Sequence, residues 1–116
     1  RTAHEEAALR ELSLEMIDAD IDEWDFGENR FDLVTMLYAG DHVKWIDKIK
    51  TSLREGGIFL VEGWAKEASD SPYGFSEGQL ASLFEGYEIL RDETVDGAPD
   101  WAWDEGKLVR FVARKK

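Results

Sequence analysis

Two short, almost wholly apolar runs constrain the fold of this chain more than any other feature. They are FDLVTMLY at residues 31–38 and IFLVE at residues 58–62, and an amphipathic stretch at residues 42–54 lies between them. A strand that is apolar on both sides suits a sheet covered on both faces, as in parallel sheets whose strands are joined by helices. The pattern therefore predicts an α/β sheet.

The other segments extend this pattern along the chain. Gln79 stands three residues after Ser76, which forms a capping box at the start of a helix, and Gly86 is expected to end that helix. Gly56 and Gly57 are expected to end the helix that precedes IFLVE. We expect helices at residues 2–12, 42–54 and 76–86, and strands at residues 14–21, 31–38, 58–62, 87–95 and 107–114.

Connections and length set the topology that we expect. The last two strands have no helix between them, so they should form an antiparallel hairpin that closes the sheet. A chain of 116 residues is one domain's worth of protein, and we expect residues 1–116 to form a single α/β domain.

Composition and charge exclude several classes of protein. With 26 acidic residues against 14 basic ones, the net charge of −12 repels nucleic acid phosphates. The chain has no cysteine, which excludes disulfides, thiolate metal sites and cysteine nucleophiles, and His4 and His42 alone exclude a histidine-rich metal site. No apolar run approaches the roughly 18 residues that span a membrane, and no signal peptide pattern is present. We expect a cytoplasmic protein without metal, nucleic acid or membrane.

The order of the motifs resembles a known family. DADIDEWDF, then NRFDLVTMLYAG, then a helix ending in LREGG and the run IFLVEGW resemble the second half of a class I S-adenosylmethionine-dependent methyltransferase. GYEILRDETV and KLVRFVARKK resemble that family's closing strands, and the nearest variety is the small-molecule or tellurite-resistance type. The resemblance implies a Rossmann-like methyltransferase sheet, mostly parallel with an antiparallel C-terminal hairpin. It also implies S-adenosylmethionine as cofactor and a small molecule as methyl acceptor.

The front of the chain departs from the family. The family's first strand, its glycine-rich loop and its second strand have no counterpart, and the sequence begins at Arg1 inside an expected helix. We therefore expect the C-terminal part of a methyltransferase domain that lacks its first strands. FDLVTMLY, IFLVE and KLVRFVAR should then be neighbours, with YEILRDETV at the outer edge and residues 14–21 separated from FDLVTMLY. The FDLVTMLY strand should expose an apolar edge.

The resemblance places cofactor-binding residues at the ends of two expected strands. It implies that Asp20 accepts a hydrogen bond from the adenine amino group and that the Ile21 backbone N–H reaches a ring nitrogen. Leu37 and Tyr38 would line the methionine half of the cofactor. Read from the residues alone, Asp20 also suits a solvated acidic turn, and Leu37 also suits a strand running into a core.

Candidate acceptor-binding and proton-transfer residues lie farther along. Glu62 ends the IFLVE strand, and the resemblance implies that the loop containing Trp64 and Tyr73 covers the substrate. Both aromatic residues could instead anchor the loop to the domain. His42 could take a proton from the acceptor, or it could be a helix-start residue facing water. Methyl transfer often needs no dedicated base, because positioning supplies much of the rate.

Other functions remain as alternatives at this point. The same fold could serve as a non-catalytic partner-binding or oligomerisation module, and a homodimer could supply the strands that the chain lacks. A phosphoacceptor receiver domain is also an acidic α/β protein. It needs a lysine after its penultimate strand, and Gly63 follows IFLVE.

Overall fold

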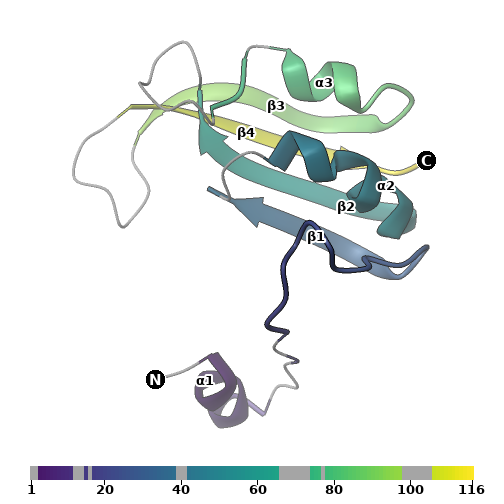
Figure 1. Ribbon diagram of the computed structural model, residues 1–116. Coiled ribbons are helices and arrows are strands. Elements are labelled where there is room, and N and C mark those ends of the chain that lie inside the picture. The colour runs from purple at the N-terminus through teal and green to yellow at the C-terminus, as the bar shows by residue number, and fades with distance from the viewer. Residues whose placement is uncertain are drawn as a thin grey trace.

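A mixed sheet of four strands forms the body of the molecule (Figure 1). The computed structural model describes residues 3–11, 15, 17–38, 42–65, 74–76, 78–97 and 106–116. Its elements are, in chain order, α1 (Ala3–Leu9), β1 (Phe31–Leu37), the 3₁₀ helix η1 (His42–Trp45), α2 (Ile46–Ser52), β2 (Leu53–Trp64), α3 (Gln79–Leu83), β3 (Glu88–Gly97) and β4 (Gly106–Arg114).

The strand order confirms the expected topology. The sheet runs β1-β2-β4-β3, with β1 and β2 parallel and the other two pairs antiparallel. β3 therefore lies at the outer edge and β4 beside β2, as the sequence predicted. β1 forms the opposite edge, and Leu33 and Leu37 on it are 55% and 58% exposed, which confirms the predicted apolar edge.

The strand predicted at residues 14–21 is wrong for its described part. Residues 15 and 17–20 have no regular structure, and a turn begins at Ile21. The Asp20 carbonyl accepts hydrogen bonds from the backbone N–H groups of Glu23 and Trp24 at 3.0 and 2.8 Å, which folds the acidic segment back on itself. A strand needs a neighbour for its backbone N–H and C=O groups, and no described strand lies beside this segment.

The helix predicted at residues 42–54 is shorter than expected. It splits into η1 and α2 and ends at Ser52, and β2 begins at Leu53. Gly56 and Gly57 lie inside β2, where the pairing register shifts between Phe31 and Leu33. Gly56 has a φ of 81°, and a Cβ on Gly57 would lie 2.7 Å from the Arg54 carbonyl oxygen. The two glycines therefore permit a bulge in β2 instead of capping α2.

The helices predicted at residues 2–12 and 76–86 form at the expected places but are shorter than predicted. The stretch predicted at residues 2–12 is helical as α1, which lies apart from the sheet (Figure 1). The helix predicted from Ser76 forms only as α3. Half of its capping box is present, since the Gln79 side chain accepts a hydrogen bond from the Ser76 backbone N–H at 3.0 Å. No helix in the described part of the chain is long and apolar enough to cross a membrane.

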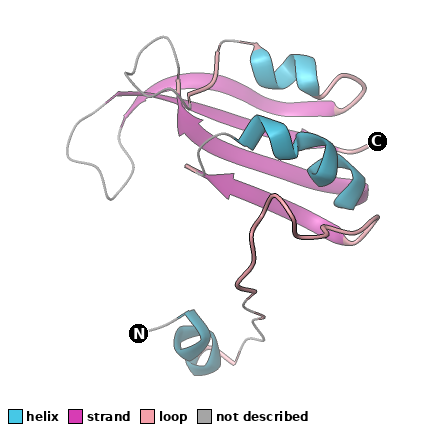
Figure 2. Cartoon of the chain, viewed as in Figure 1, coloured by secondary structure: helices cyan, strands magenta, loops and turns pink. Residues whose placement is uncertain are grey.

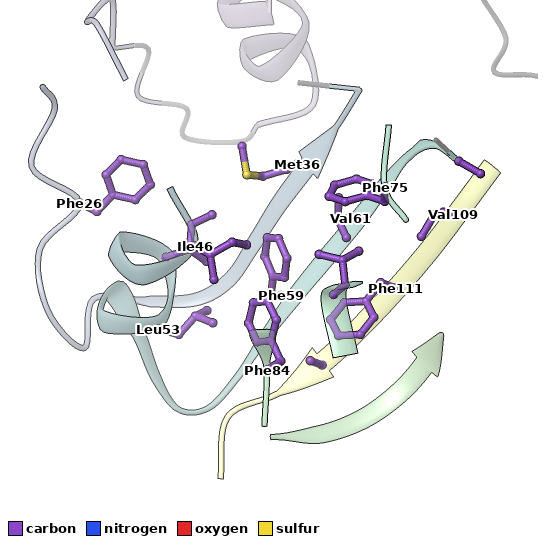
Figure 3. Packing of buried hydrophobic residues seen from close by; sticks show 14 residues of the cluster. Phe26, Met36, Ile46, Leu53, Phe59, Val61, Phe75, Phe84, Val109 and Phe111 are labelled. Carbon is purple, nitrogen blue, oxygen red and sulfur yellow. The ribbon is translucent and has the colours of Figure 1, made fainter. Parts of the chain in front are cut away.

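The core lies between the sheet and the two helices α2 and α3, which cover the same face (Figure 2). Phe84, which follows α3, stacks on Phe59 of β2 with ring centroids 5.2 Å apart and also contacts Phe111 of β4 (Figure 3). All three side chains are fully buried. Aromatic rings bury large apolar areas, so this cluster fixes α3 on the sheet.

We expect Phe84→Ala to destabilise the domain by about 3–5 kcal/mol, because it leaves a cavity beside the rings of Phe59, Phe111 and Tyr87. The free energy of unfolding, measured by urea denaturation, checks this value. Leu90→Ala is the control, since Leu90 is 43% exposed and its loss should change stability by no more than about 0.5 kcal/mol. Equal effects of the two changes would contradict the described core.

Candidate functional site

A polar corner forms where β1 and β2 reach their carboxyl ends. Tyr38 follows β1 directly, and its backbone N–H donates to the Glu62 carbonyl at 2.9 Å. Its hydroxyl donates to Glu62 Oε1 at 2.6 Å. Tyr38 has a φ of 55°, a left-handed conformation that costs a non-glycine residue about 1–2 kcal/mol. Two hydrogen bonds to one residue hold it there, and strained residues of this kind cluster at functional sites.

Glu62 is held from both sides. Arg110 of β4 lies opposite Glu62 in the antiparallel register, and its Nε donates to Glu62 Oε2 at 2.9 Å. The Glu62 side chain keeps 25% of its surface exposed and that of Arg110 43%. The carboxylate is therefore fixed in direction and still reachable from solvent.

Trp64 adds an aromatic surface to the corner. It lies two residues after Glu62 on the same side of β2, and its ring meets that of Tyr38 edge-on at 5.7 Å between centroids. A Cβ on Gly106 would approach Trp64 Cζ3 to 2.9 Å, so the indole lies directly against the start of β4. Tyr38, Glu62, Trp64 and Arg110 thus form one contiguous cluster, which we call the Tyr38 corner.

The Tyr38 hydroxyl is a donor and not a base. Burial raises the pKa of the Tyr38 phenol above its ordinary value of 10.0, and the hydrogen bond to Glu62 and that residue's charge raise it further. Arg110 acts in the opposite direction with a smaller effect. The phenol therefore keeps its proton at neutral pH and points it at Glu62.

Asp20 lies in an exposed acidic turn. Its Oδ1 accepts from the Asp22 backbone N–H at 3.0 Å, and Ile21 beside it is 37% exposed. A shallow hollow of about 190 Å³ adjoins this turn, lined by Ile17, Ala19, Ile21 and Trp24. None of the described contacts joins Asp20 to Tyr38 or Glu62.

Hydrogen bonds tie the acidic segment to the helical connection between β1 and β2. Asp22 Oδ1 accepts from Trp45 Nε1 at 2.6 Å, and Lys48 Nζ donates to the Asp22 carbonyl at 2.7 Å. The Trp45 hydrogen bond, followed by that of Lys44, lowers the pKa of Asp22.

Farther along, the backbone N–H of Arg30 donates to the Ser52 carbonyl at 2.8 Å, near the end of α2. The segment therefore follows the helical connection from η1 to the end of α2.

The structure brings together part of the predicted site. Tyr38, Glu62 and Trp64 are in one cluster, whereas Leu37 lies at the exposed sheet edge. Tyr73 and the His42 side chain lie outside the described residues. Sequence reasoning missed Arg110, although a charged residue in the middle of the apolar run KLVRFVAR was a signal. Within the described part of the chain, no three acidic or histidine side chains are grouped to hold a metal ion.

Solved structures with the same fold include several methyltransferases. TehB from Haemophilus influenzae matches with a TM-score of 0.81 at 18% identity, over 97% of this chain and 45% of that one. The [4+2]-cyclase SpnF matches with a TM-score of 0.68 at 19% identity, over 97% and 60%. A SAM-dependent methyltransferase from Aquifex aeolicus matches with a TM-score of 0.58 at 16% identity, over 95% and 61%. No family model and no curated protein matches the chain.

These likenesses show the fold. The chain has a truncated Rossmann-like α/β sheet and spans less than two thirds of the length of each of these three structures. The sheet matches a truncated Rossmann-like methyltransferase fold, which confirms the predicted resemblance and fold class.

We expect Tyr38→Phe to lower the free energy of unfolding by roughly 1 kcal/mol at neutral pH, because it removes a hydrogen bond to a partly exposed carboxylate. The folded-state pKa of Tyr38 is raised, so this contribution is fully present below pH 10.0 and disappears as the pH rises through the folded-state pKa. Urea denaturation of both chains from neutral to alkaline pH measures the difference.

Glu62→Gln is the matched variant, since it retains an acceptor and removes the charge that helps to raise the pKa of Tyr38. The NMR signals of the Tyr38 ring should then titrate at lower pH in this variant than in the parent chain. A Tyr38 phenol that ionises near 10.0 in the folded parent chain would contradict the hydrogen bond described here.

Proposed function

We propose that this chain is part of an S-adenosylmethionine-dependent methyltransferase that methylates a small-molecule acceptor. The observation that carries the proposal is the Tyr38 corner, a fixed cluster at the carboxyl ends of the parallel strands β1 and β2. Ligands of open α/β sheets bind beyond the carboxyl ends of the strands. The methyltransferases that share this fold supply the reaction class.

The residues around Asp20 fit one side of a nucleoside site. Asp20 Oδ1 accepts a hydrogen bond from the Asp22 backbone N–H. The second carboxylate oxygen of Asp20 is available to accept a hydrogen bond from an exocyclic amine. The apolar hollow beside Ile21 offers a surface on which a flat base can lie. We assign Asp20 and Ile21 to the adenine end of the cofactor, and Leu37 and Tyr38 to its methionine end.

When bound, S-adenosylmethionine supplies a methyl group on a positively charged sulfur. The net charge of −12 favours the approach of such a cation. Glu62 and Trp64, and Tyr73 by the resemblance, bind the acceptor. The Glu62 carboxylate can accept a hydrogen bond from a hydroxyl or amine of the acceptor, and the rings of Tyr38 and Trp64 offer an aromatic surface beside it. Orientation of the acceptor toward the methyl group then supplies much of the rate. His42 is the candidate for removing a proton from the acceptor.

NMR titration of the ¹⁵N-labelled chain with S-adenosylhomocysteine tests this proposal. We expect weak binding, because the chain provides one side of the site, with the largest chemical-shift changes at Asp20, Ile21 and Tyr38. Adenosine alone should shift the signals of Asp20 and Ile21, and methionine alone should shift the signal of Tyr38.

Asp20→Asn should weaken the adenosine response at least tenfold, since the charged acceptor of its amino group is lost. The control is Asp92→Asn, the same change at an exposed acidic residue of β3. Shifts that are absent at millimolar ligand in a folded chain, or that fall mainly on β3, would overturn the assignment.

An oligomerisation module remains the second candidate function. The exposed leucines of the β1 edge favour it, since such an edge is a template for another strand. The same fold carries different functions, since SpnF shares it and is named a [4+2]-cyclase.

A further inference from the structure

Asp22 lies at the centre of the hydrogen bonds that hold the Asp20 turn against the helical connection between β1 and β2. Asp22 Oδ1 accepts from the indole N–H of Trp45 at 2.6 Å, and it lies 3.3 Å from Lys44 Nζ. Both partners belong to η1 and stand 23 and 22 positions farther along the chain. The Asp22 side chain therefore joins two segments that are distant in sequence.

Lys48 of α2 holds the backbone of the same turn. Its Nζ donates to the Asp22 carbonyl at 2.7 Å and to the Trp24 carbonyl at 3.3 Å, and it lies 5.4 Å from the centroid of the Phe26 ring. An ammonium group has three N–H donors, and two of them are used on carbonyls of this one segment. We call the set of Asp22, Trp45 and Lys48 the Asp22 clamp.

The clamp lies directly beside the residues that we assign to adenine. Asp20 Oδ1 accepts from the Asp22 backbone N–H, and the Asp20 carbonyl accepts from the backbone N–H of Trp24. The clamp therefore holds both residues that bond to Asp20. Trp24 also lines the apolar hollow beside Ile21. A displacement of this turn would move the carboxylate acceptor and the apolar surface together.

The donor side of the clamp is fixed by the core, whereas the acceptor side is on the surface. Trp45 packs against the core cluster, and Ile46 and Ile49, which follow it, are 2% and 0% exposed. The Asp22 side chain keeps 50% of its surface exposed. Binding residues on a surface turn are held precisely when their neighbours bond to a rigid element.

We propose that Asp22 is a positioning residue, which acts with Trp45 and Lys48 to hold Asp20 and Ile21 in the conformation that accepts an adenine base. This inference rests on the proposed function, because it concerns the adenine end of that site. Apparent affinity falls in proportion to the fraction of molecules in the binding conformation. Loss of the clamp should therefore weaken nucleoside binding and leave the methionine end unchanged.

The titration of Asp22 tests the clamp without any ligand. The polar and charged groups around this carboxylate are Trp45 and Lys44 of η1, Lys48 of α2, and Asp20 and Glu23 of its own segment. The Trp45 hydrogen bond, followed by that of Lys44, lowers the pKa of Asp22, and desolvation acts in the opposite direction.

Carboxyl ¹³C NMR should show Asp22 titrating below its ordinary pKa of 3.8 in the parent chain. In Trp45→Phe, which keeps an aromatic ring and removes the N–H donor, the pKa should rise toward 3.8, because the charged form loses a hydrogen bond. The same Asp22 pKa in both chains would overturn the inference.

Adenosine titration of ¹⁵N-labelled variants tests the positioning role. Trp45→Phe and Asp22→Ala should each raise the Kd for adenosine about tenfold. Asp22→Asn keeps an oxygen that can accept from Trp45, and it should bind within about threefold of the parent chain. Asp47→Asn, a loss of the same charge at an exposed residue of α2, should bind like the parent chain. The Tyr38 response to methionine should be unchanged in all four variants.

The outcomes distinguish this inference from the proposed function. Parent-like adenosine binding by Trp45→Phe and Asp22→Ala would overturn the inference and leave the proposed function standing. Equal weakening by Asp22→Asn and Asp22→Ala would assign the effect to charge alone and would also overturn the inference, as would a parallel loss of the Tyr38 response. A folded parent chain that does not bind adenosine would overturn the proposed function, and the inference with it.

Discussion

The parallel pairing of β1 with β2 is the interaction on which the rest of the structure depends. It sets Leu37 opposite Glu62, so the residue that follows β1 meets the Glu62 backbone and side chain together. The same pairing requires a crossover, and η1 with α2 provides it on the face that becomes the core. The acidic segment then packs along that crossover through Trp45 and Lys48.

The strand order could be predicted from the sequence because it depends on local patterns. Apolar runs separated by an amphipathic helix indicate parallel strands, and two strands without a helix between them indicate a hairpin. Tyr38, Glu62 and Trp64 were assigned through the family resemblance, Tyr38 to the cofactor and Glu62 and Trp64 to the acceptor. The structure brings these three residues together because the carboxyl ends of adjacent parallel strands lie near one another.

The remaining features depend on long-range pairing that a sequence pattern does not contain. Arg110 joins the Tyr38 corner only through the antiparallel register of β2 with β4, across 48 positions of the chain. Gly56 and Gly57 resemble a helix cap in sequence, yet β2 uses them to shift its register against β1. Residues 17–21 have the composition of a strand, but no described strand lies beside them.

The position of β4 has a consequence for how the protein is made. Among the described strands, β4 is synthesised after the other three, and it lies inside the sheet between β2 and β3. Until β4 leaves the ribosome, β2 lacks one neighbouring strand and β3 has none among the described strands. Phe59 also lacks Phe111, which shares its core. The apolar strand β2 therefore stays exposed on one side until β4 has been synthesised, and the sheet can close only then.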